Sequence, residues 1–517
     1  MKRWIYIVMM VLSAVQLMAQ DSLMVHPSPR LDNLQSSINF VDSRLHLGRV
    51  QASLTLLSVC TRILNSQSKK RPWRAAAEVL GINLGVHAFD RLVMNEEFAQ
   101  VKPKHIWHNL KNGFVWDNDQ FATNLFAHPY HGNLYFNAAR SNGLSFFASA
   151  PYALGGSLMW EMAGEIEPPA INDLIATTIG GIAIGEVAHR VSDMILDNKA
   201  KGFPRFVREF TAGVVNPMKA LNRLITGEAW KVDRSSHSQT EQSAYDFSMT
   251  FGDRYLADKT DLFLGENNPY LDFKLKYGNP FDEDRRKPYD HFIANVTFGL
   301  SKNQPLVNSI HLLGRLWGTP INTGTDMKVE FGLFQHFNYY DSSPVRKDTD
   351  RVPYRISEAA SIGPGVIYDF PTVGNLARLE QRIFLNAILL GGTKSDYYNV
   401  IDRDYNMGSG LSVKMNSLVE FSRMGRFLLN VDYYRLYTWK GYEGKDLATV
   451  DPLYLNAQGD KGNALLLVIN PNAEINLNQN FRINVSAFSY IRRTFYKYHP
   501  NVHFNTFELR LGLSYHL

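Results

Sequence analysis

The sequence predicts an α+β membrane protein, in which an N-terminal helical module precedes a transmembrane antiparallel β-barrel of about twelve strands. Three observations support this prediction. The chain begins with the pattern of a secretory signal. The spacing of apolar residues then changes from a helical period in the first half to a period of two in the second half. Finally, the links between the expected strands alternate between long and short, as in outer-membrane barrels.

The first 19 residues have the order of a secretory signal peptide. Lys2 and Arg3 precede an apolar stretch that runs from Trp4 to Val15, and the small residue Ala19 marks the cleavage site. We therefore expect a cleaved signal peptide over 1–19 and an exported mature chain. Residues 20–71 would then form an N-terminal periplasmic segment.

Composition argues against a disulfide-stabilised protein and against a nucleic-acid-binding protein. Cys60 is the only cysteine in the chain, so no disulfide can form within it. The formal net charge of +5 falls to +3 when Lys2 and Arg3 leave with the signal. A charge this small and this dispersed does not indicate nucleic-acid binding. Stability must come from packing and from backbone pairing.

Residues 72–230 are expected to form the helical module, placed either in the periplasm or as a plug in the barrel lumen. Apolar residues recur here at helical spacing, and prolines punctuate the stretch. One helix is expected through Leu174 to Leu196, capped by Asn172 or Asp173, because these side chains accept hydrogen bonds from first-turn amides. Residues 231–243 then form a linker.

An uncharged stretch runs from Ser141 to Trp160, and its length would just allow a transmembrane helix. Pro151 and several polar residues instead indicate two short helices or a re-entrant segment bent at this proline. We expect this segment to pack on the Leu174–Leu196 helix. The close approaches would be at Gly155-Gly156 and at the Gly181–Gly185 spacing, since small residues let backbones come near one another.

Residues 244–517 alternate apolar and polar side chains, which places the two classes on opposite faces of each strand. The apolar face is expected to meet lipid and the charged face to meet the lumen. The lipid-facing set includes Phe298, Phe331, Leu385 and Val431, and the lumen-facing set includes Glu330, Arg382 and Asp432. A soluble sandwich is the alternative, but its apolar faces would need a second sheet to cover them. A closed barrel has no unpaired edge, which lipid could not satisfy.

The links between strands predict the orientation of the barrel. If the signal delivers the chain to the periplasm, the first strand runs outward, the long links lie outside and the C-terminus is periplasmic. The final stretch, Phe507 to Leu517, resembles the terminal strand of outer-membrane barrels, although it ends in leucine rather than an aromatic residue. The long links are Gly252–Asn268, Asp341–Pro353, Gly391–Gly410 and Lys440–Gly462, and the short ones include Asp369–Asn375, Ser422–Arg426 and Asn478–Asn480.

A set of polar residues in the helical half is the candidate site. Glu186 and His189 lie three residues apart, on one face of the expected helix. We expect them to form a structural polar cluster with Arg190, because a buried charge persists when it is paired. Glu161 and Asp173 are its expected further members. The full candidate set is His128, His131, Glu161, Glu165, Asp173, Glu186, His189 and Arg190.

A metal site is the alternative for the same residues, since a Glu-x-x-His unit offers one oxygen and one nitrogen ligand. A di-iron bundle needs two such units and this region has one, and the His-Glu-x-x-His pattern of zinc proteases is absent. We therefore predict no metal and no cofactor, and we assign no catalytic residue.

Short polar motifs in this half carry a family resemblance. With the signal and the barrel pattern, they resemble an uncharacterised family of Gram-negative envelope proteins, a domain of unknown function, that joins such a helical module to a β-barrel. The resemblance covers roughly residues 100 to 230 and implies an architecture without a known reaction. The motifs are His108–Phe121, His128–Gly132, Ala138–Gly143, Gly155–Glu165, Pro168–Leu174 and Gly185–Arg190.

These patterns favour a non-enzymatic outer-membrane barrel over an enzyme. A channel for small solutes and a structural envelope protein are the two versions, with the helical module plugging or underlying the lumen. The alternative is a lipid-modifying hydrolase with its site in the helical module or at the barrel rim, which would need a serine activated by a histidine. The expected partners are outer-membrane lipid and the barrel-assembly machinery, with no nucleic acid. The small solute or lipid ligand stays undefined.

Overall fold

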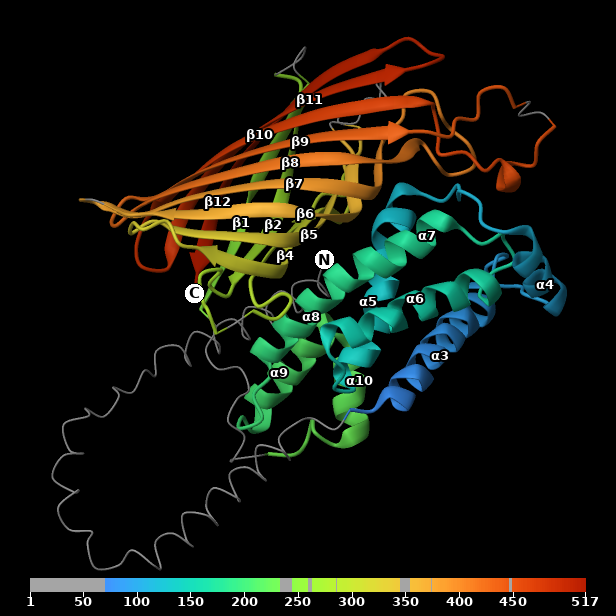
Figure 1. Ribbon diagram of the computed structural model, residues 1–517, viewed down its shortest axis with the longest axis horizontal. Helices are drawn as coiled ribbons and strands as arrows, with labels where there is room; N and C mark the ends of the chain where they lie inside the picture. The colour runs from blue at the N-terminus through green and yellow to red at the C-terminus, as the bar shows by residue number, and fades with distance from the viewer. Residues whose placement is uncertain are drawn as a thin grey trace, which may run out of the picture.

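The structure is a computed structural model, and it describes residues 70–232, 244–258, 263–284, 286–344, 354–372, 374–445 and 449–517. The described chain forms a helical module followed by a closed β-barrel (Figure 1). The predicted signal peptide, nearly all of the N-terminal segment, Cys60 and most of the predicted linker lie outside the described residues.

Prolines mark where several helices of the module begin. Proline occupies one of the first two positions of α3, α4, α5 and α10, where its missing N–H would have no helical partner. The described helices are α3 Pro72–Phe89, η3 Asp90–Met94, α4 Pro103–Asn112, η4 Thr123–Ala127, α5 His128–Ser141, α6 Phe146–Ala163, α7 Ile171–Ile175, η5 Ala176–Gly180, α8 Gly181–Ile195, α9 Gly202–Val215 and α10 Pro217–Thr226.

Helix α6 differs from the expected pair of short helices, because it passes through Pro151 without ending there. Ser145 begins the helix, and its hydroxyl oxygen accepts from the N–H of Ala148. Pro151 is exposed, so its ring meets no neighbouring helix, and the carbonyl left without a helical donor belongs to Phe147, which is also exposed. The proline therefore costs one hydrogen bond at the surface and leaves the helix continuous.

The expected cap of the next helix is also different. Ala170 precedes α7, and no side chain caps the helix. Asn172 and Asp173 lie inside its first turn, and the Asn172 amide oxygen accepts from the N–H of Asp117 instead. Helices α7, η5 and α8 run on as one stretch, Ile171–Ile195, which by length and composition is apolar enough to cross a membrane although most of it is buried.

Helix α5 is the centre of the module, and both α6 and α8 pack on it rather than mainly on each other. A Cβ atom at Gly132 of α5 would lie 1.7 Å from the carbonyl oxygen of Thr177 in η5. A Cβ atom at Gly156 would lie 2.5 Å from the Tyr135 ring, and one at Gly185 would lie 2.8 Å from the Phe136 ring. Of the predicted glycines, Gly156, Gly181 and Gly185 make close contacts, but with α5, and Gly155 makes none.

The second half of the chain forms a closed antiparallel barrel of twelve strands, as predicted. Each strand pairs with its neighbours in sequence, and β12 pairs with β1 to close the ring. The strands are β1 Tyr245–Asp258, β2 Glu266–Tyr277, β3 Phe292–Gly299, β4 Val307–Ile321, β5 Lys328–Tyr340, β6 Ile356–Phe370, β7 Leu376–Lys394, β8 Tyr405–Phe421, β9 Gly425–Thr438, β10 Gly462–Asn476, β11 Phe481–Tyr496 and β12 Val502–His516.

Some strands continue past the residues at which we expected links to begin. Gly252 was expected to end the first strand, but β1 runs through it to Asp258. A Cβ atom at Gly252 would lie 2.2 Å from the carbonyl oxygen of Leu511, so this glycine permits close strand packing instead of a turn. β7 likewise extends beyond Gly391 to Lys394.

The predicted strand faces agree with the structure. Phe331 and Leu385 are 38% and 53% exposed on the outer wall, whereas Glu330 beside Phe331 is fully buried inside. Arg382 and Asp432 line the lumen. Phe298 and Val431 lie one residue from the lumen-lining Thr297 and Asp432, and therefore face outward.

The helical module lies against the outer wall of the barrel and not inside the lumen (Figure 1). The amide of Gln335 on β5 donates to the carbonyl of Ile179 in η5 over 2.9 Å. The rings of Phe121 and Tyr339 lie 5.4 Å apart. All residues that line the lumen cavity come from the barrel half of the chain. Of the placements that we expected, a plug in the lumen is therefore wrong, because the module packs on outward-facing apolar residues while charged strand residues fill the interior.

We predict that arginine at an outer-wall position destabilises the barrel more than arginine in the lumen. Leu385→Arg should lower the free energy of unfolding by roughly 2–4 kcal/mol, because it places a charge in hydrocarbon. Asn416→Arg is the matched control, since Asn416 lines the lumen cavity. Unfolding in lipid bilayers measures both, and equal losses would contradict the assignment of the two faces.

Candidate functional site

The eight candidate residues fall into two separate groups. Glu186, His189 and Arg190 lie on α8 near the link between β2 and β3. The other five lie near the opposite ends of the helices, where α6 ends and α7 begins. Glu161 is thus not a partner of Glu186, as the sequence led us to expect. None of the eight belongs to a group of three ligating side chains within 4.8 Å of one another among the described residues.

Glu186 is the centre of the first group. Its side chain is fully buried, and its two carboxylate oxygens accept from two arginines. The Arg140 Nε atom lies 2.7 Å from Oε2, and the Arg190 Nε atom lies 2.9 Å from Oε1. Arg190 also donates to Asp290 of the β2–β3 link over 2.8 Å. A series of ion pairs therefore connects the helical module to the barrel, and it runs from Arg140 through Glu186 and Arg190 to Asp290.

His189 does not join this carboxylate. Its Nε2 atom lies 3.4 Å from Asp193, one helical turn further along α8. Asp193 also pairs with Lys219 of α10, whose Nζ atom lies 2.7 Å away. Ser192 donates to the backbone carbonyl of His189 and not to its ring. This arrangement ties α10 to α8, and the serine is not placed for activation by the histidine.

The second group is acidic. Glu161 accepts from the N–H of Ala170 over 2.8 Å, and the Nε2 atom of His128 lies 3.7 Å from Asp173. The ring of His131 packs between aromatic side chains, with centroid distances of 4.6 Å to Tyr135 and 5.3 Å to Trp160. These contacts give the two histidines packing roles in the helical interior.

Further carboxyl groups from the adjoining loops surround the acidic group. Burial, followed by repulsion from Asp117, raises the pKa of Asp119 to about 8. Burial also raises the pKa of Glu165 and of Glu167, again with repulsion from neighbouring carboxylates. At neutral pH this part of the molecule therefore holds protons that the same side chains would release in water.

Loops of the barrel form hydrogen bonds with the acidic end of the module. The amide of Asn118 donates to the carbonyl of Pro452 over 2.9 Å, and the hydroxyl of Tyr398 donates to the Asn118 side chain over 2.7 Å. Arg403 donates to the carbonyl of Asp117 over 2.6 Å. The segment that joins α4 to η4 is thus held between the β7–β8 and β9–β10 links.

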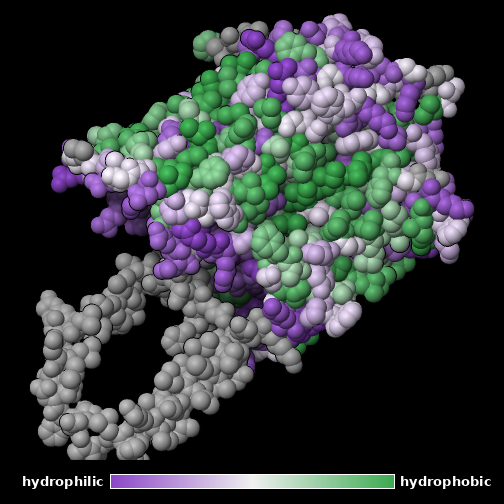
Figure 2. Space-filling model, in the orientation of Figure 1, coloured by the Kyte–Doolittle hydropathy of each residue, from purple (hydrophilic) through white to green (hydrophobic). Residues whose placement is uncertain are grey.

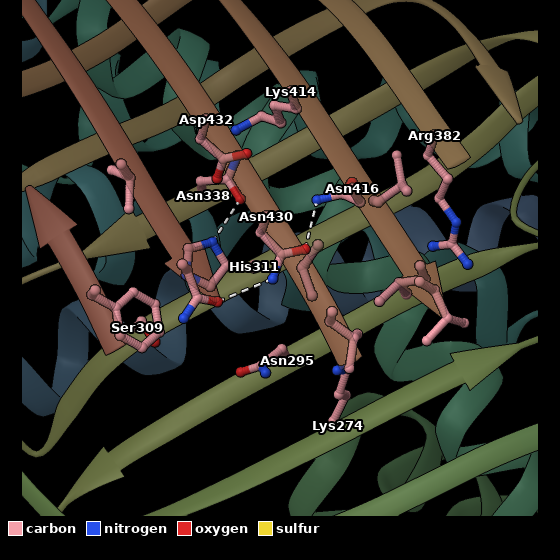
Figure 3. Close-up of a pocket in the computed structure, with 18 of the residues that line it drawn as sticks. Lys274, Asn295, Ser309, His311, Asn338, Arg382, Lys414, Asn416, Asn430 and Asp432 are labelled. Carbon is pink, nitrogen blue, oxygen red and sulfur yellow. Dashed lines mark hydrogen bonds between the residues drawn. The ribbon is translucent and has the colours of Figure 1, made fainter. Parts of the chain in front are cut away.

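The barrel lumen contains the second candidate site, a cavity of about 290 Å³ (Figure 3). Polar side chains from many strands converge on it. The His311 ring and the Asn338 side chain share a hydrogen bond of 2.9 Å. Asn416 donates to Asn430 over 2.9 Å, and Asn430 donates to Asn470 over 3.0 Å. A row of carboxamides therefore crosses the cavity wall from β8 to β10.

Basic residues outnumber acidic ones around the cavity. Glu380 alone pairs with three cations, Lys276, Arg378 and Arg382. Lys274 lies two residues before Lys276, on the same face of β2. The lining contains seven basic residues, Lys274, Lys276, Arg378, Arg382, Lys414, Arg426 and Arg510, against the four acidic residues Asp246, Glu380, Glu420 and Asp432. The cavity surface therefore presents more basic than acidic side chains, and Glu358, Glu474 and Glu508 behind it pair with Lys414, Arg426 and Arg510.

A layer of tyrosines lies in the lumen toward the end that carries the long links. The Tyr354 ring stacks on those of Tyr340 and Tyr490, which are tilted to each other, and the centroid distances are 5.1 to 5.5 Å. Glu508, which is fully buried, accepts from the hydroxyl groups of Tyr340 and Tyr490 over 3.1 Å each. The aliphatic side chains packed with this layer are Ile356, Ile388, Leu436 and Leu466. All three tyrosines line the cavity, so this layer bounds the cavity toward the long links.

Sequence reasoning missed both Arg140 and the tyrosine layer. Arg140 lies in one of the motifs that carry the family resemblance, but it is 46 residues from Glu186. The tyrosines occupy inward-facing positions, which their place in the strand alternation could have shown. Tyrosine counts as apolar in a simple periodicity, and this obscured the layer.

Comparison with known proteins agrees with the resemblance drawn from the motifs. Residues 113–218 match the family model of a domain of unknown function (DUF3943). This match begins just before the segment held by the barrel loops and ends at the start of α10. No curated protein matches the chain.

Among solved structures, similar chains include the NanC porin, with 11% identity, a TM-score of 0.26, and coverage of 53% of this chain and 100% of that one. OmpT, an outer membrane protein of Vibrio cholerae, has 8% identity, a TM-score of 0.22, and coverage of 53% and 99%. The translocator domain of the autotransporter NalP from Neisseria meningitidis has 12% identity, a TM-score of 0.20, and coverage of 59% and 97%.

We predict that Glu186→Gln destabilises the contact between module and barrel. The substitution removes the buried carboxylate that pairs with Arg140 and leaves Arg190 with Asp290 alone, and breaking a buried pair costs about 3–5 kcal/mol. Glu228→Gln is the control, because Glu228 is an exposed partner of Arg223 and should contribute less than about 1 kcal/mol. The free energy of unfolding and the yield of folded protein report the effect. Equal behaviour of the two variants would refute the structural role.

We also predict that the helical module loses stability as pH rises from about 4 to about 8. The folded state binds the Asp119 proton more tightly than the unfolded state does, since its pKa rises from 3.8 to about 8. Deprotonation in this window therefore favours unfolding. Thermal unfolding followed by helical circular dichroism should show the decline, and Asp119→Asn should reduce it. A pH profile that is the same in the variant would contradict the raised pKa.

Proposed function

We propose that this protein resides in the outer membrane, with the barrel and the helical module side by side in the bilayer. A closed barrel satisfies its backbone internally and can therefore cross lipid. Its outer wall exposes large apolar side chains, and Figure 2 shows apolar side chains on the barrel and on the neighbouring helices. The exposed wall residues include Phe331, Ile383, Leu385, Val413, Phe427, Leu511 and Leu513.

The exposed faces of the helices support the placement of the module in the bilayer. Phe147 of α6 is 68% exposed, and Leu154 and Leu158 follow on the same helix. Trp73 and Leu84 give α3 a similar face. Contiguous apolar surfaces of this kind indicate contact with a membrane or a partner. Outer-membrane lipid is the partner we propose, because these helices lie beside a wall that itself needs lipid.

The proposed orientation follows from the links. The chain enters the barrel at β1 and leaves it at β12 from one end, which would face the periplasm. The β5–β6, β7–β8 and β9–β10 links would then face outward. The cavity reaches toward the periplasmic end, where Asp246, Lys276 and Arg426 line it.

We propose that the lumen is a blind binding cavity for a small anionic solute that enters from the periplasm. The tyrosine layer closed by Glu508 is the observation that carries this proposal, since an open channel needs a continuous path. The excess of basic side chains favours an anion, and the carboxamide row supplies neutral donors and acceptors. No observation in the described helices favours the hydrolase alternative, because Ser192 is bonded to a backbone carbonyl.

Conductance across planar bilayers tests the proposal. The unmodified protein should insert without a steady ionic current, because the tyrosine layer blocks the lumen. Removing two of its rings in the Tyr340→Ala, Tyr490→Ala double variant should open a current that favours anions over cations. The Tyr368→Ala variant is the control, since Tyr368 lies outside the layer. A steady current through the unmodified protein would show a channel instead.

A further inference from the structure

A compact group of ligating side chains lies at the opposite end of the barrel from the cavity mouth. Glu443 follows β9, Asp460 precedes β10, and His499 lies in the link between β11 and β12. One carboxylate oxygen from each acid and one ring nitrogen of the histidine all lie within 4.8 Å of one another. The β9–β10 link and the β11–β12 link thus bring two oxygens and one nitrogen close together.

Each carboxylate has one oxygen that accepts hydrogen bonds from the protein and one that accepts none. Asp460 uses Oδ2 to accept from the Ser395 hydroxyl and from the N–H of Tyr398. Glu443 uses Oε1 to accept from the N–H of Lys461 over 2.8 Å. The remaining oxygens, Oδ1 of Asp460 and Oε2 of Glu443, are buried and accept no hydrogen bond.

These unpartnered oxygens point to a missing positive group. The side chain of Asp460 is fully buried, and its Oδ1 lies 3.9 Å from the Nε2 atom of His499. A buried carboxylate oxygen without a donor carries a large desolvation cost unless a cation or a donor offsets it.

The surroundings hold the three side chains in place. The ring of His499 stacks on Tyr397 at a centroid distance of 4.5 Å and an angle of 19°. The Tyr442 hydroxyl lies 3.3 Å from its Nε2 atom. A Cβ atom at Gly441 would lie 1.7 Å from Oε2 of Glu443, so glycine there leaves room for that carboxylate to fold back. The ligand positions are therefore set by packing before any ion binds.

We infer that Glu443, Asp460 and His499 form a binding site for a divalent transition-metal ion of the Zn²⁺ class. Imidazole together with carboxylates suits Zn²⁺, whereas Ca²⁺ and Mg²⁺ prefer ligand sets made of oxygen alone. A bound ion joins the β9–β10 link to the β11–β12 link, and through Ser395 to the β7–β8 link. This site is independent of the proposed function of the lumen, and it is contrary to the sequence-based prediction of no metal.

Calorimetric titration of the purified full chain with ZnCl₂, after treatment with a chelator, tests the site. We expect one saturable site per chain. His499→Ala and Glu443→Gln should each weaken binding by about tenfold or more, which is about 1.4 kcal/mol per factor of ten. Glutamine can still accept from Lys461, so the second variant keeps the contact that orders its loop.

The control is His503→Ala, which removes an exposed histidine of β12 outside the group and should bind as the unmodified protein does. A shift in electrophoretic mobility on heating verifies that each variant retains a folded barrel. The inference is overturned by an absence of saturable zinc binding, by zinc binding that both site variants retain, or by tighter binding of Ca²⁺ than of Zn²⁺.

Discussion

Closure of the strand ring is the constraint on which the rest of the structure depends. Twelve antiparallel strands pair in sequence order, and β12 returns to β1. With every edge paired, the backbone needs no solvent, so side chains alone decide what each face contacts. The outer wall can then be apolar and the inner wall charged. This inverts the usual relation between core and surface in a globular protein, in which the charged side chains face water outside.

The inverted arrangement makes paired charges and aromatic rings the filling of the barrel. Glu358 forms an ion pair with Lys414 at 3.0 Å, and Glu508 forms one with Arg510 at 2.5 Å. Each carboxylate also accepts from neutral groups, which satisfies its remaining lone pairs. Because the interior is filled in this way, there is no space in it for the helical module. The module finds apolar partners only on the outer wall, at residues such as Phe337 and Ala359.

The sequence pattern predicted the barrel because the face on which a strand residue lies depends only on its position within that strand. Whether Phe331 or Glu330 faces lipid depends on its parity within one strand, which a single sequence shows. The position of the helical module depends on contacts such as that between Phe121 and Tyr339, which are far apart in the chain and leave no periodic trace. The same limit applies to the candidate site. Arg190 was expected beside Glu186 because they are one turn apart, whereas Arg140 and Asp290 come from other elements.

The bridge from Arg140 through Glu186 and Arg190 to Asp290 also sets an order of assembly. Within the helices alone, two guanidinium groups surround one carboxylate, so the group has an uncompensated positive charge. Asp290, which supplies the missing negative charge, belongs to the link between β2 and β3. The helices are made before that link, and their charges balance only after it has formed. The ion pairs of this group are therefore complete only when the module is docked on the link between β2 and β3.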